Sequence, residues 1–358
     1  MIPEADEDDA AVRAVDPVPA TAASVPPGRS PGHERPAPRA AGRLVVAGAV
    51  ALLAWPIVEV ALHLWFRANV VTRDHWREAA AFVRAEWRDG DLVTAAPRWA
   101  DPNMREVMGD RLSPSAAGRS DTAAFSRLWV MSIRGHESPE APARAADLTR
   151  EIGPVTVSRW VLPRPVVRTD LVERLATARV ELLHDGQSRP CPWRERGIAA
   201  GGGVDDGPIT PAERFVCDPV RSWLWVGVTT IEDMALLPRR CVWHHPEGRN
   251  PIRATFDDLE LSNAVVLYGG IHYDQARDLT GGPVHVRVLV DGSPAGRATF
   301  RDADGWKRLV VDTRASRGQR HDLSIEVTAP DPRLRVFCWA ASVRDAAGEP
   351  PPARSETW

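Results

Sequence analysis

Cys241, His244 and His245 are close together in the sequence and carry side chains that often bind zinc. Adjacent histidines on a strand point to opposite faces, so only one of the two could join the cysteine. His272 and Asp274 share a face of a later segment and could complete a set of four ligands. The alternative is a disulfide with histidines at the surface. We expect this second arrangement, so the sequence predicts no metal site.

The four cysteines all lie in the C-terminal half of the chain, and none forms a CxxC pair. An even number of cysteines in an exported domain permits one or two disulfides, whereas a reduced compartment would leave four buried thiols. We expect disulfides, although four cysteines allow three full pairings and the sequence does not select one. The residues concerned are Cys191, Cys217, Cys241 and Cys338.

Residues with catalytic side chains are present, but their spacing matches no known catalytic motif. Gly292-Ser293-Pro294-Ala295-Gly296 lacks the Gly-x-Ser-x-Gly spacing of a nucleophile elbow and falls on a predicted hairpin. The glycines at 201–203 lack the spacing of a phosphate-binding loop. Asp205-Asp206 and Asp257-Asp258 could act on a glycosidic bond only if two carboxylates faced each other across a cleft. The sequence therefore predicts no catalytic residue and no cofactor.

Aromatic and polar side chains in the C-terminal half could together bind a sugar. An exposed aromatic ring can stack on a sugar ring, while nearby polar side chains bond to the sugar hydroxyl groups. Each aromatic residue could equally belong to the core, which is the commoner place for it. The candidate ligand-binding residues are Trp243, His245, Tyr273, Asp274, Trp306 and Trp339.

These candidates lie in a region whose apolar residues alternate with a period of two, as in strands. Val284, Val286, Val288 and Val290 fall on one face, and Asp291-Gly292 favours a tight turn before the return strand. Similar segments recur, roughly eight in all, from residue 213 onward. The pattern predicts an antiparallel β-sandwich of jelly-roll type over residues 213–345.

The preceding segment, 74–185, alternates between helical and strand patterns. Residues 74–91 place apolar side chains on one helical face, and 92–96 and 127–133 have the composition of buried strands. We predict further helices from residue 101 and over 141–153 and 169–178, with strands over 154–162 and 179–183. This order predicts a small α/β domain with a mostly parallel sheet, followed by a linker over 186–212.

The longest apolar run, Leu44 to Phe66, is bracketed by Arg43 and Arg67. As a helix it is long enough to cross a bilayer, and its apolar residues outweigh the insertion cost of Glu59. We predict one uncleaved transmembrane helix over 43–67.

Glu59 and His63 are four residues apart, so they share one helix face. That face could dock on a multi-span membrane protein, or both residues could be hydrated near the outer interface. Arginines flank the run on both sides, so charge does not set its orientation. The cysteines and the interfacial aromatic residues favour an extracytoplasmic location for the C-terminal domains.

The two ends of the chain, 1–42 and 346–358, have no periodic apolar pattern and are predicted to be disordered. The net charge of the chain is −3 at pH 7. This value excludes a general nucleic-acid binder, because phosphate binding needs a basic surface.

Two stretches resemble known families. Asp74-His75-Trp76-Arg77-Glu78-Ala79-Ala80, followed by Gly90-Asp91 and an apolar strand, resembles the extracytoplasmic segment of bacterial GT-C membrane glycosyltransferases. Those enzymes have many spans and an acidic motif in their first outer loop, which this chain lacks, so the resemblance implies an accessory part without the catalytic core. Residues 250–345 resemble galactose-binding-like jelly rolls, which often bind carbohydrate.

These observations lead to one main hypothesis and one alternative. The main hypothesis is a single-pass protein of the plasma membrane with extracytoplasmic domains that have a non-catalytic binding or assembly role. Its expected partners are the lipid bilayer, a multi-span membrane protein and cell-surface glycan. The alternative is an envelope polysaccharide-processing enzyme, a hydrolase or a relative of glycosyltransferases, that uses carboxylates in the sandwich loops.

Overall fold

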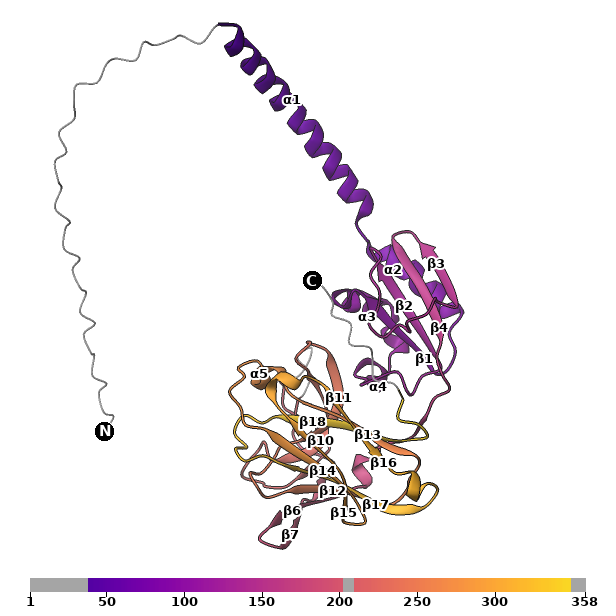
Figure 1. The fold of residues 1–358 in the computed structure, drawn as a ribbon, viewed down its shortest axis with the longest axis vertical. Coiled ribbons are helices and arrows are strands. Elements are labelled where there is room, and N and C mark those ends of the chain that lie inside the picture. The colour runs from indigo at the N-terminus through magenta and orange to yellow at the C-terminus, as the bar shows by residue number, and fades with distance from the viewer. Residues whose placement is uncertain (1–37, 202–208, 349–358) are drawn as a thin grey trace, which may run out of the picture. The chain divides into compact units, whose positions relative to one another are not determined.

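The computed structural model of the chain describes residues 38–201 and 209–348 (Figure 1). It divides into two units, residues 1–68 and residues 69–358. The expected disordered ends fall mainly on residues 1–37 and 349–358, which lie outside the described residues. Residues 38–42 belong to a helix and do not bear out the predicted tail there.

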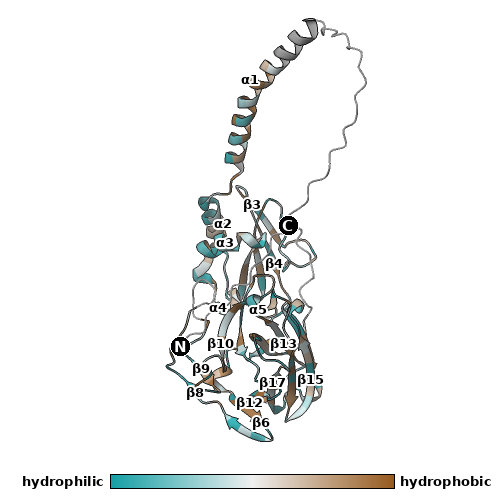
Figure 2. Ribbon diagram, turned by 90° about the vertical axis from the view of Figure 1, so that its left-hand side faces the viewer, coloured by the Kyte–Doolittle hydropathy of each residue, from teal (hydrophilic) through white to brown (hydrophobic). Residues whose placement is uncertain are grey.

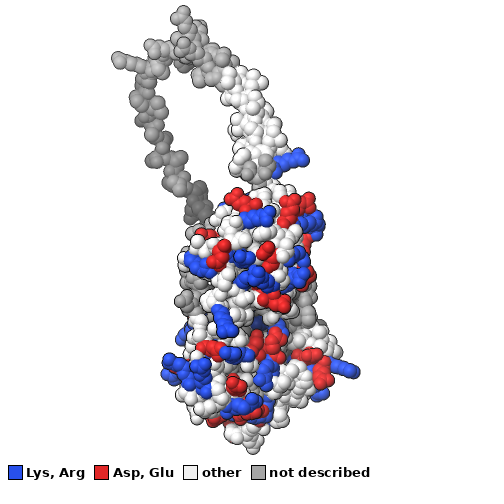
Figure 3. Space-filling view, turned by 90° about the vertical axis from the view of Figure 1, so that its right-hand side faces the viewer, with Lys and Arg blue, Asp and Glu red and all other residues white. Residues whose placement is uncertain are grey.

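Helix α1 (Pro38–Asn69), all but its last residue, belongs to the first unit and includes the predicted apolar run. Residues Gly48–Arg67 are long and apolar enough to cross a membrane, and nothing in the described structure buries them. On the face that Figure 3 shows, the described part of α1 carries almost no charged side chains, whereas residues 69–348 carry many of both signs. By length and composition, this is the one helix of the described residues that could cross a membrane.

The second unit begins with a four-stranded sheet of order β1-β2-β4-β3, which we call the α/β layer together with its helices. Its strands are β1 (Asp91–Ala96), β2 (Arg127–Ile133), β3 (Leu148–Ile152) and β4 (Val155–Val161). Helices α2 (Arg73–Ala85) and α3 (Asp101–Met108) pack on it, and the short α4 (Pro114–Ala117) follows. As the helical pattern predicts, α2 buries one face, formed by Trp76, Ala79, Ala80 and Val83.

The α/β layer differs from the prediction in two respects. Only β1 and β2 are parallel, and the remaining pairs are antiparallel, so the predicted mostly parallel sheet is wrong. The predicted helix over 141–153 is also wrong, because its second half is strand β3. Gly153, at φ 56°, reverses the chain there, so that residues 148–152 pair with β4. This pairing overrides the helix propensity of an alanine- and arginine-rich segment.

The predicted helix over 169–178 is wrong as well. Residues Val167–Asp170 form strand β5, and only the short 3₁₀ turn Leu175–Thr177 follows. Strand β5 pairs with β18 (Phe337–Arg344), and β6 (Arg179–His184) pairs with β12 (Ile252–Glu260). Both partners are strands of the sandwich. The chain thus enters the sandwich before the boundary expected at residue 185.

The sandwich has two antiparallel sheets. The first has the order β16-β13-β18-β11-β10-β9-β8, with β5 also on β18, and the second has the order β15-β14-β17-β12-β6-β7. Strands β7 and β8 lie in the predicted linker, which therefore carries part of both sheets. The remaining bounds are β7 (Gln187–Pro190), β8 (Trp193–Arg194), β9 (Arg214–Val216), β10 (Trp225–Glu232), β11 (Pro238–His244), β13 (Ala264–Ile271), α5 (Tyr273–Ala276), β14 (Val284–Val290), β15 (Ser293–Phe300), β16 (Lys307–Asp312) and β17 (Arg320–Thr328).

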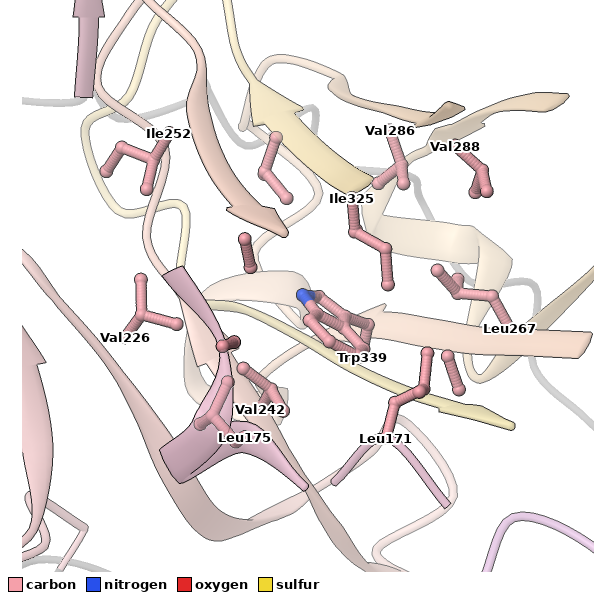
Figure 4. Packing of buried hydrophobic residues seen from close by; sticks show 14 of the residues in the cluster. Leu171, Leu175, Val226, Val242, Ile252, Leu267, Val286, Val288, Ile325 and Trp339 are labelled. Atoms are coloured by element: carbon pink, nitrogen blue, oxygen red, sulfur yellow. The ribbon is translucent and has the colours of Figure 1, made fainter. Parts of the chain in front are cut away.

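The core lies between the two sheets and is filled by alternate residues of the strands. Strand β17 shows the predicted alternation of apolar and polar residues and turns Leu323, Ile325 and Val327 into the core. Figure 2 shows hydrophobic and hydrophilic stretches together on the strands of the sandwich. Trp339 lies in the centre of this core among valine, leucine and isoleucine side chains (Figure 4). The predicted turn at Asp291-Gly292 joins β14 to β15 with both residues at positive φ, 48° and 76°. The antiparallel sandwich is therefore confirmed.

The segment after α4 joins the α/β layer to the first sheet of the sandwich. Gly118 O accepts a hydrogen bond from Arg240 N at 2.8 Å, and a Cβ at Gly118 would lie 2.4 Å from that nitrogen. Asp121 Oδ2 accepts from Tyr268 Oη at 2.8 Å and from Arg344 Nη1 at 2.7 Å. Only glycine allows the close approach, and the shared carboxylate then fixes the two parts of the unit together.

Candidate ligand-binding groove

An open groove of about 790 Å³ lies where four connecting segments of the sandwich meet. The segments precede β10, follow β11, precede β14 and precede β18. Its volume falls in the range of small-molecule sites, and its lining combines apolar surface with a few polar groups, as such sites usually do. The lining residues are Arg221, Trp223, Trp243, His245, Glu247, Thr280, Gly281, Gly282, Asp331, Pro332, Arg333, Leu334, Arg335 and Val336.

Trp243 forms part of the lining and is the last residue but one of β11. It lies opposite Gly227 in β10, where a Cβ would lie 2.9 Å from Arg214 Cβ and 3.2 Å from Trp225 Cε3. The ring stacks on Trp225 with centroids 4.6 Å apart and planes 10° apart. Trp243 Nε1 is buried and has no hydrogen-bond partner among the described residues. A buried N–H group without a partner costs about 1–3 kcal/mol, so a ligand acceptor there would recover free energy.

Two exposed apolar residues lie at the mouth of the groove. Trp223 is 52% exposed and Leu334 is 68% exposed. Leu334 has φ 53°, in the left-handed region that leucine rarely adopts. A residue held there costs about 1 kcal/mol or more, and such positions are commoner at binding sites than elsewhere. Together the two side chains present an apolar surface at the mouth of the groove.

His245 adds a polar group beside Trp243. Its Nδ1 donates a hydrogen bond to Pro246 O at 2.9 Å, because a carbonyl oxygen can only accept. Burial lowers the pKa of His245, so the ring is neutral at pH 7. The neutral ring keeps an acceptor lone pair on Nε2. The groove thus contains one imidazole acceptor and one indole donor.

The charged residues of the groove are arranged in ion pairs. Arg221 pairs with Glu247 and also donates from Nε to Asp218 Oδ2 at 2.9 Å. Arg333 pairs with Asp331, and the hydrogen bond from Arg333 lowers the pKa of Asp331 to about 2. Both groove carboxylates, Glu247 and Asp331, are therefore engaged by arginines.

A buried ion pair supports the wall of the groove. Arg335 is 1% exposed and pairs with Asp302, whose Oδ2 accepts from Gly281 N at 2.8 Å. The guanidinium group packs against Gly281, since a Cβ there would lie 1.6 Å from Arg335 Nη2. Glycine is required at this position because the backbone of the wall approaches the arginine so closely.

The six predicted ligand-binding residues separate into three groups. Trp243 and His245 line the groove. Trp339 is in the core and donates from Nε1 to His244 Nδ1 at 3.0 Å, while Trp306 donates to Ser120 Oγ, in the segment after α4, at 3.0 Å. Tyr273 and Asp274 begin α5 and do not line the groove.

The four cysteines form two disulfides, Cys191–Cys217 and Cys241–Cys338, with Cα atoms 4.3 and 5.7 Å apart. The bonded sulfur of Cys241 is not a thiolate, which rules out the metal site considered from the sequence. Among the residues that the structure describes, no group of three or more His, Cys, Asp or Glu side chains is placed to hold a metal ion.

The histidines of that same cluster have structural contacts. His244 is fully buried and hydrogen-bonds to Ile252 O at 3.1 Å, and burial lowers its pKa to about 3. His272 Nδ1 accepts from Asp274 N at 3.2 Å and so caps α5. His244 and His272, two of the residues considered as metal ligands, therefore have structural contacts within the protein.

The other candidate polar residues lie away from the groove. Asp257 pairs with Arg179 at 3.0 Å, and Asp258 pairs with Arg320 at 2.8 Å, and both carboxylates are exposed at the bulge of β12. Asp205-Asp206 lie outside the described residues. Glu59 and His63 are both exposed on α1.

Sequence reasoning missed several groove residues. Trp223 lies in the turn before β10, so the alternation of strand residues does not indicate where its indole points. Leu334 and the Arg335–Asp302 pair gave no signal either, because their positions depend on how distant loops meet.

Comparisons with known proteins give no family assignment. No known family profile matches the chain, and no curated protein matches it, so the resemblance to GT-C transferases has no support there. Solved structures of carbohydrate-binding modules are similar at low TM-score. The "CBM51-2 and INT domains from Clostridium perfringens ZmpB" have a TM-score of 0.27 and 15% identity over 46% of this chain and 31% of that one.

Two smaller modules are matched over most of their own length. The "CBM51 from Clostridium perfringens GH95 in complex with methyl-galactose" has a TM-score of 0.25 and 10% identity over 43% of this chain and 92% of that one. The "C-terminal CBM6 of LamC" from Zobellia galactanivorans has a TM-score of 0.21 and 8% identity over 34% and 93%. These TM-scores are too low to support an inference about fold or ligand.

Proposed function

We propose that the chain is a non-catalytic carbohydrate-binding protein and that the groove around Trp223, Trp243 and His245 is its binding site. The observation that carries the proposal is the combination of an exposed indole at the mouth with an unpaired buried indole N–H deeper in the lining. A sugar ring has one apolar C–H face and a rim of hydroxyl groups. The groove offers matching surfaces for both.

Each contact has a defined chemical role. The exposed face of Trp223 would cover the C–H face of a sugar ring and remove about 60 Å² of indole surface from water, a fraction of the 150–250 Å² that an aromatic residue can bury. At about 25 cal/mol/Å² this contact contributes about 1.5 kcal/mol. Trp243 Nε1 would donate to one hydroxyl oxygen, and His245 Nε2 would accept from another hydroxyl group.

The groove carboxylates favour binding over hydrolysis. A retaining or inverting glycosidase needs one protonated and one ionised carboxyl group facing each other across the bond. Glu247 and Asp331 are both engaged by arginines, and the pKa of Asp331 is lowered rather than raised. This arrangement supports a binding role.

The test is a glycan array of neutral and acidic oligosaccharides probed with the full-length protein in detergent. We expect selective binding that is lost in Trp223→Ala. Trp99→Ala is the matched control, because Trp99 is also 52% exposed but lies outside the groove. A flat array, or equal loss of binding in both variants, would refute the proposal.

We also propose that α1 anchors the protein in a membrane and that the domains after it are extracytoplasmic. The support is the length and apolar composition of Gly48–Arg67, together with two disulfides in the second unit. Extraction of membranes with alkaline carbonate should leave the protein in the pellet, and protease added outside intact cells should digest residues 69–358. Recovery in the soluble fraction without detergent contradicts the anchor.

Within that proposal, the α1 face with Glu59 and His63 remains a predicted docking surface for a multi-span membrane protein. Crosslinking from residue 59 or 63 in membranes should yield a discrete adduct, and crosslinking only to lipid would remove the prediction.

A further inference from the structure

Arg221 is the arginine of the sandwich groove with the most carboxylate partners. Its Nη1 donates to Glu247, and its Nε donates to Asp218 Oδ2 at 2.9 Å. The side chain of Arg221 is 34% exposed, and those of Asp218 and Glu247 are 17% and 22% exposed. These groups are partly shielded from water, so a ligand in the groove interacts with their charges more strongly than with charges at an open surface. At this side of the groove, one formal positive charge is matched by two negative ones.

The other two arginines of the lining are paired as well. Arg333 Nη2 donates to Asp331 Oδ2 at 2.7 Å, and Arg335 Nη1 donates to Asp302 Oδ1. Arg335 Nε is buried and has no hydrogen-bond partner among the described residues. Because Asp302 already balances Arg335, a second carboxylate at Nε would place two negative charges on one guanidinium group.

The groove and its pairing partners together carry a negative formal charge. Three arginines are matched by four carboxylates, which gives a formal charge of −1. Burial lowers the pKa of His245, so this ring adds no positive charge at pH 7. An acidic sugar would therefore enter a site in whose lining every arginine is already paired, and its carboxylate would lose hydrating water without gaining a counter-charge.

The hydrogen-bonding groups that Trp243 and His245 offer a ligand carry no charge. Trp243 Nε1 is a donor without a partner among the described residues, and the neutral His245 ring has an acceptor on Nε2. A hydroxyl group can both accept and donate, so the hydroxyl groups of a sugar satisfy the indole and the imidazole alike. A carboxylate can only accept, so it would leave His245 Nε2 without a donor.

We infer that the groove selects uncharged saccharides and rejects those that carry a carboxylate, sulfate or phosphate group. This inference rests on the proposed carbohydrate-binding function and adds to it the class of sugar. Glu247 and Asp331 determine the selectivity, because they are the two carboxylates in the lining itself.

The test compares three forms of each oligosaccharide on an array probed with the full-length protein, in a detergent without sugar groups. The first form has the ordinary C6 hydroxymethyl group, the second has a C6 carboxylate, and the third has the corresponding carboxamide, which resembles the carboxylate in shape but is uncharged. Low ionic strength keeps the screening of charges small. We expect the carboxylate to bind about tenfold or more weakly than the carboxamide in calorimetric titration, because a like charge repels it in a partly buried site.

The outcomes separate this inference from the proposed function. An array on which no form binds refutes carbohydrate binding itself. Carboxylate forms that bind no more weakly than their carboxamides leave carbohydrate binding in place and overturn the selectivity.

A double variant makes the selectivity specific to the two carboxylates of the lining. Glu247→Gln with Asp331→Asn removes two negative charges and so changes the formal charge from −1 to +1. It should raise the affinity for the carboxylate form relative to the carboxamide about tenfold or more, a gain that misfolding cannot produce.

Asp258→Asn with Asp312→Asn is the matched control. This variant also removes the carboxylate partners of two exposed arginines, but both positions lie outside the lining. We expect it to discriminate against the carboxylate form as wild type does. Unchanged discrimination in the groove variant, or an equal loss of discrimination in the control, contradicts the inference.

Discussion

The sandwich and the α/β layer are stabilised by different interactions. The sandwich has a large apolar core between two sheets and is crosslinked by two disulfides. The α/β layer has a smaller core and places a buried ion pair, Arg127 with Asp91, at the start of its two parallel strands. Asp91 also accepts from Trp129 Nε1 at 2.9 Å. We therefore expect loss of the disulfides to lower the stability of the sandwich. Deletion of one charge of the buried ion pair should lower the stability of the α/β layer.

The largest effect is expected for the disulfide that closes the longer loop. Cys241 and Cys338 are 97 residues apart, whereas Cys191 and Cys217 are 26 apart. In the chain-entropy estimate, removing the first costs about 4.7 kcal/mol and removing the second about 3.5 kcal/mol. Urea unfolding of the two double cysteine-to-alanine variants tests the order. Equal stability of wild type and both variants would show that the crosslinks do not stabilise the sandwich.

A comparable loss is expected in the α/β layer from one substitution. Asp91→Ala leaves Arg127 buried with its positive charge uncompensated, which costs about 3–5 kcal/mol. The side chains of both residues are almost completely buried. Asp312→Ala removes the partner of an exposed arginine and serves as the control, with unchanged stability expected. If both variants unfold at the same urea concentration as wild type, the buried pair does not have the role assigned to it.

The sequence predicted the sandwich better than it predicted the α/β layer. The sandwich was predictable because period-two alternation, as in residues 284–290, directly reflects which face of a strand meets the core. The helix expected over 141–153 was wrong because the pairing of β3 with β4 overrides local propensity there.

The groove was only partly predictable. Trp243 in β11 and His245 directly after it were candidate ligand-binding residues from the sequence, and both line the groove. Leu334, Gly281 and the Arg335–Asp302 pair come together only when loops distant in sequence meet. No local sequence pattern predicts these contacts, because the order of the strands in the sheets determines which loops lie next to each other.

A smaller effect on the sandwich is expected from pH. The pKa of His244 is about 3 in the folded state, against an ordinary value of 6.5. The unfolded chain therefore binds a proton as the pH falls below 6.5, while the folded chain does not until about pH 3. The neutral, buried His244 therefore contributes its full stabilisation above pH 6.5, and this contribution is lost as the pH falls from 6.5 toward 3.

Between pH 7 and pH 5 this residue alone should lower the free energy of unfolding by about 2 kcal/mol. Chemical denaturation at the two pH values measures the change, and His244→Gln should reduce it. A wild-type stability that rises on acidification, or a pH dependence that His244→Gln leaves unaltered, contradicts the burial of a neutral imidazole at this position.

The smallest effect on stability is expected in the groove, at Trp223. Because this side chain is 52% exposed, Trp223→Ala should change the free energy of unfolding by no more than about 0.5 kcal/mol. Trp339→Ala removes a core indole and should cost about 3–5 kcal/mol. Thermal unfolding of the two variants measures the difference. Comparable destabilisation in both would place Trp223 among the structural residues of the sandwich.

The groove as a carbohydrate site is tested most directly by isothermal titration of wild type, Trp223→Ala and Trp99→Ala with the oligosaccharide that binds best on the array. We predict equal affinity for wild type and Trp99→Ala, and a Kd about tenfold or more weaker for Trp223→Ala, the equivalent of about 1.4 kcal/mol. Undiminished affinity in Trp223→Ala would contradict the assignment of the groove.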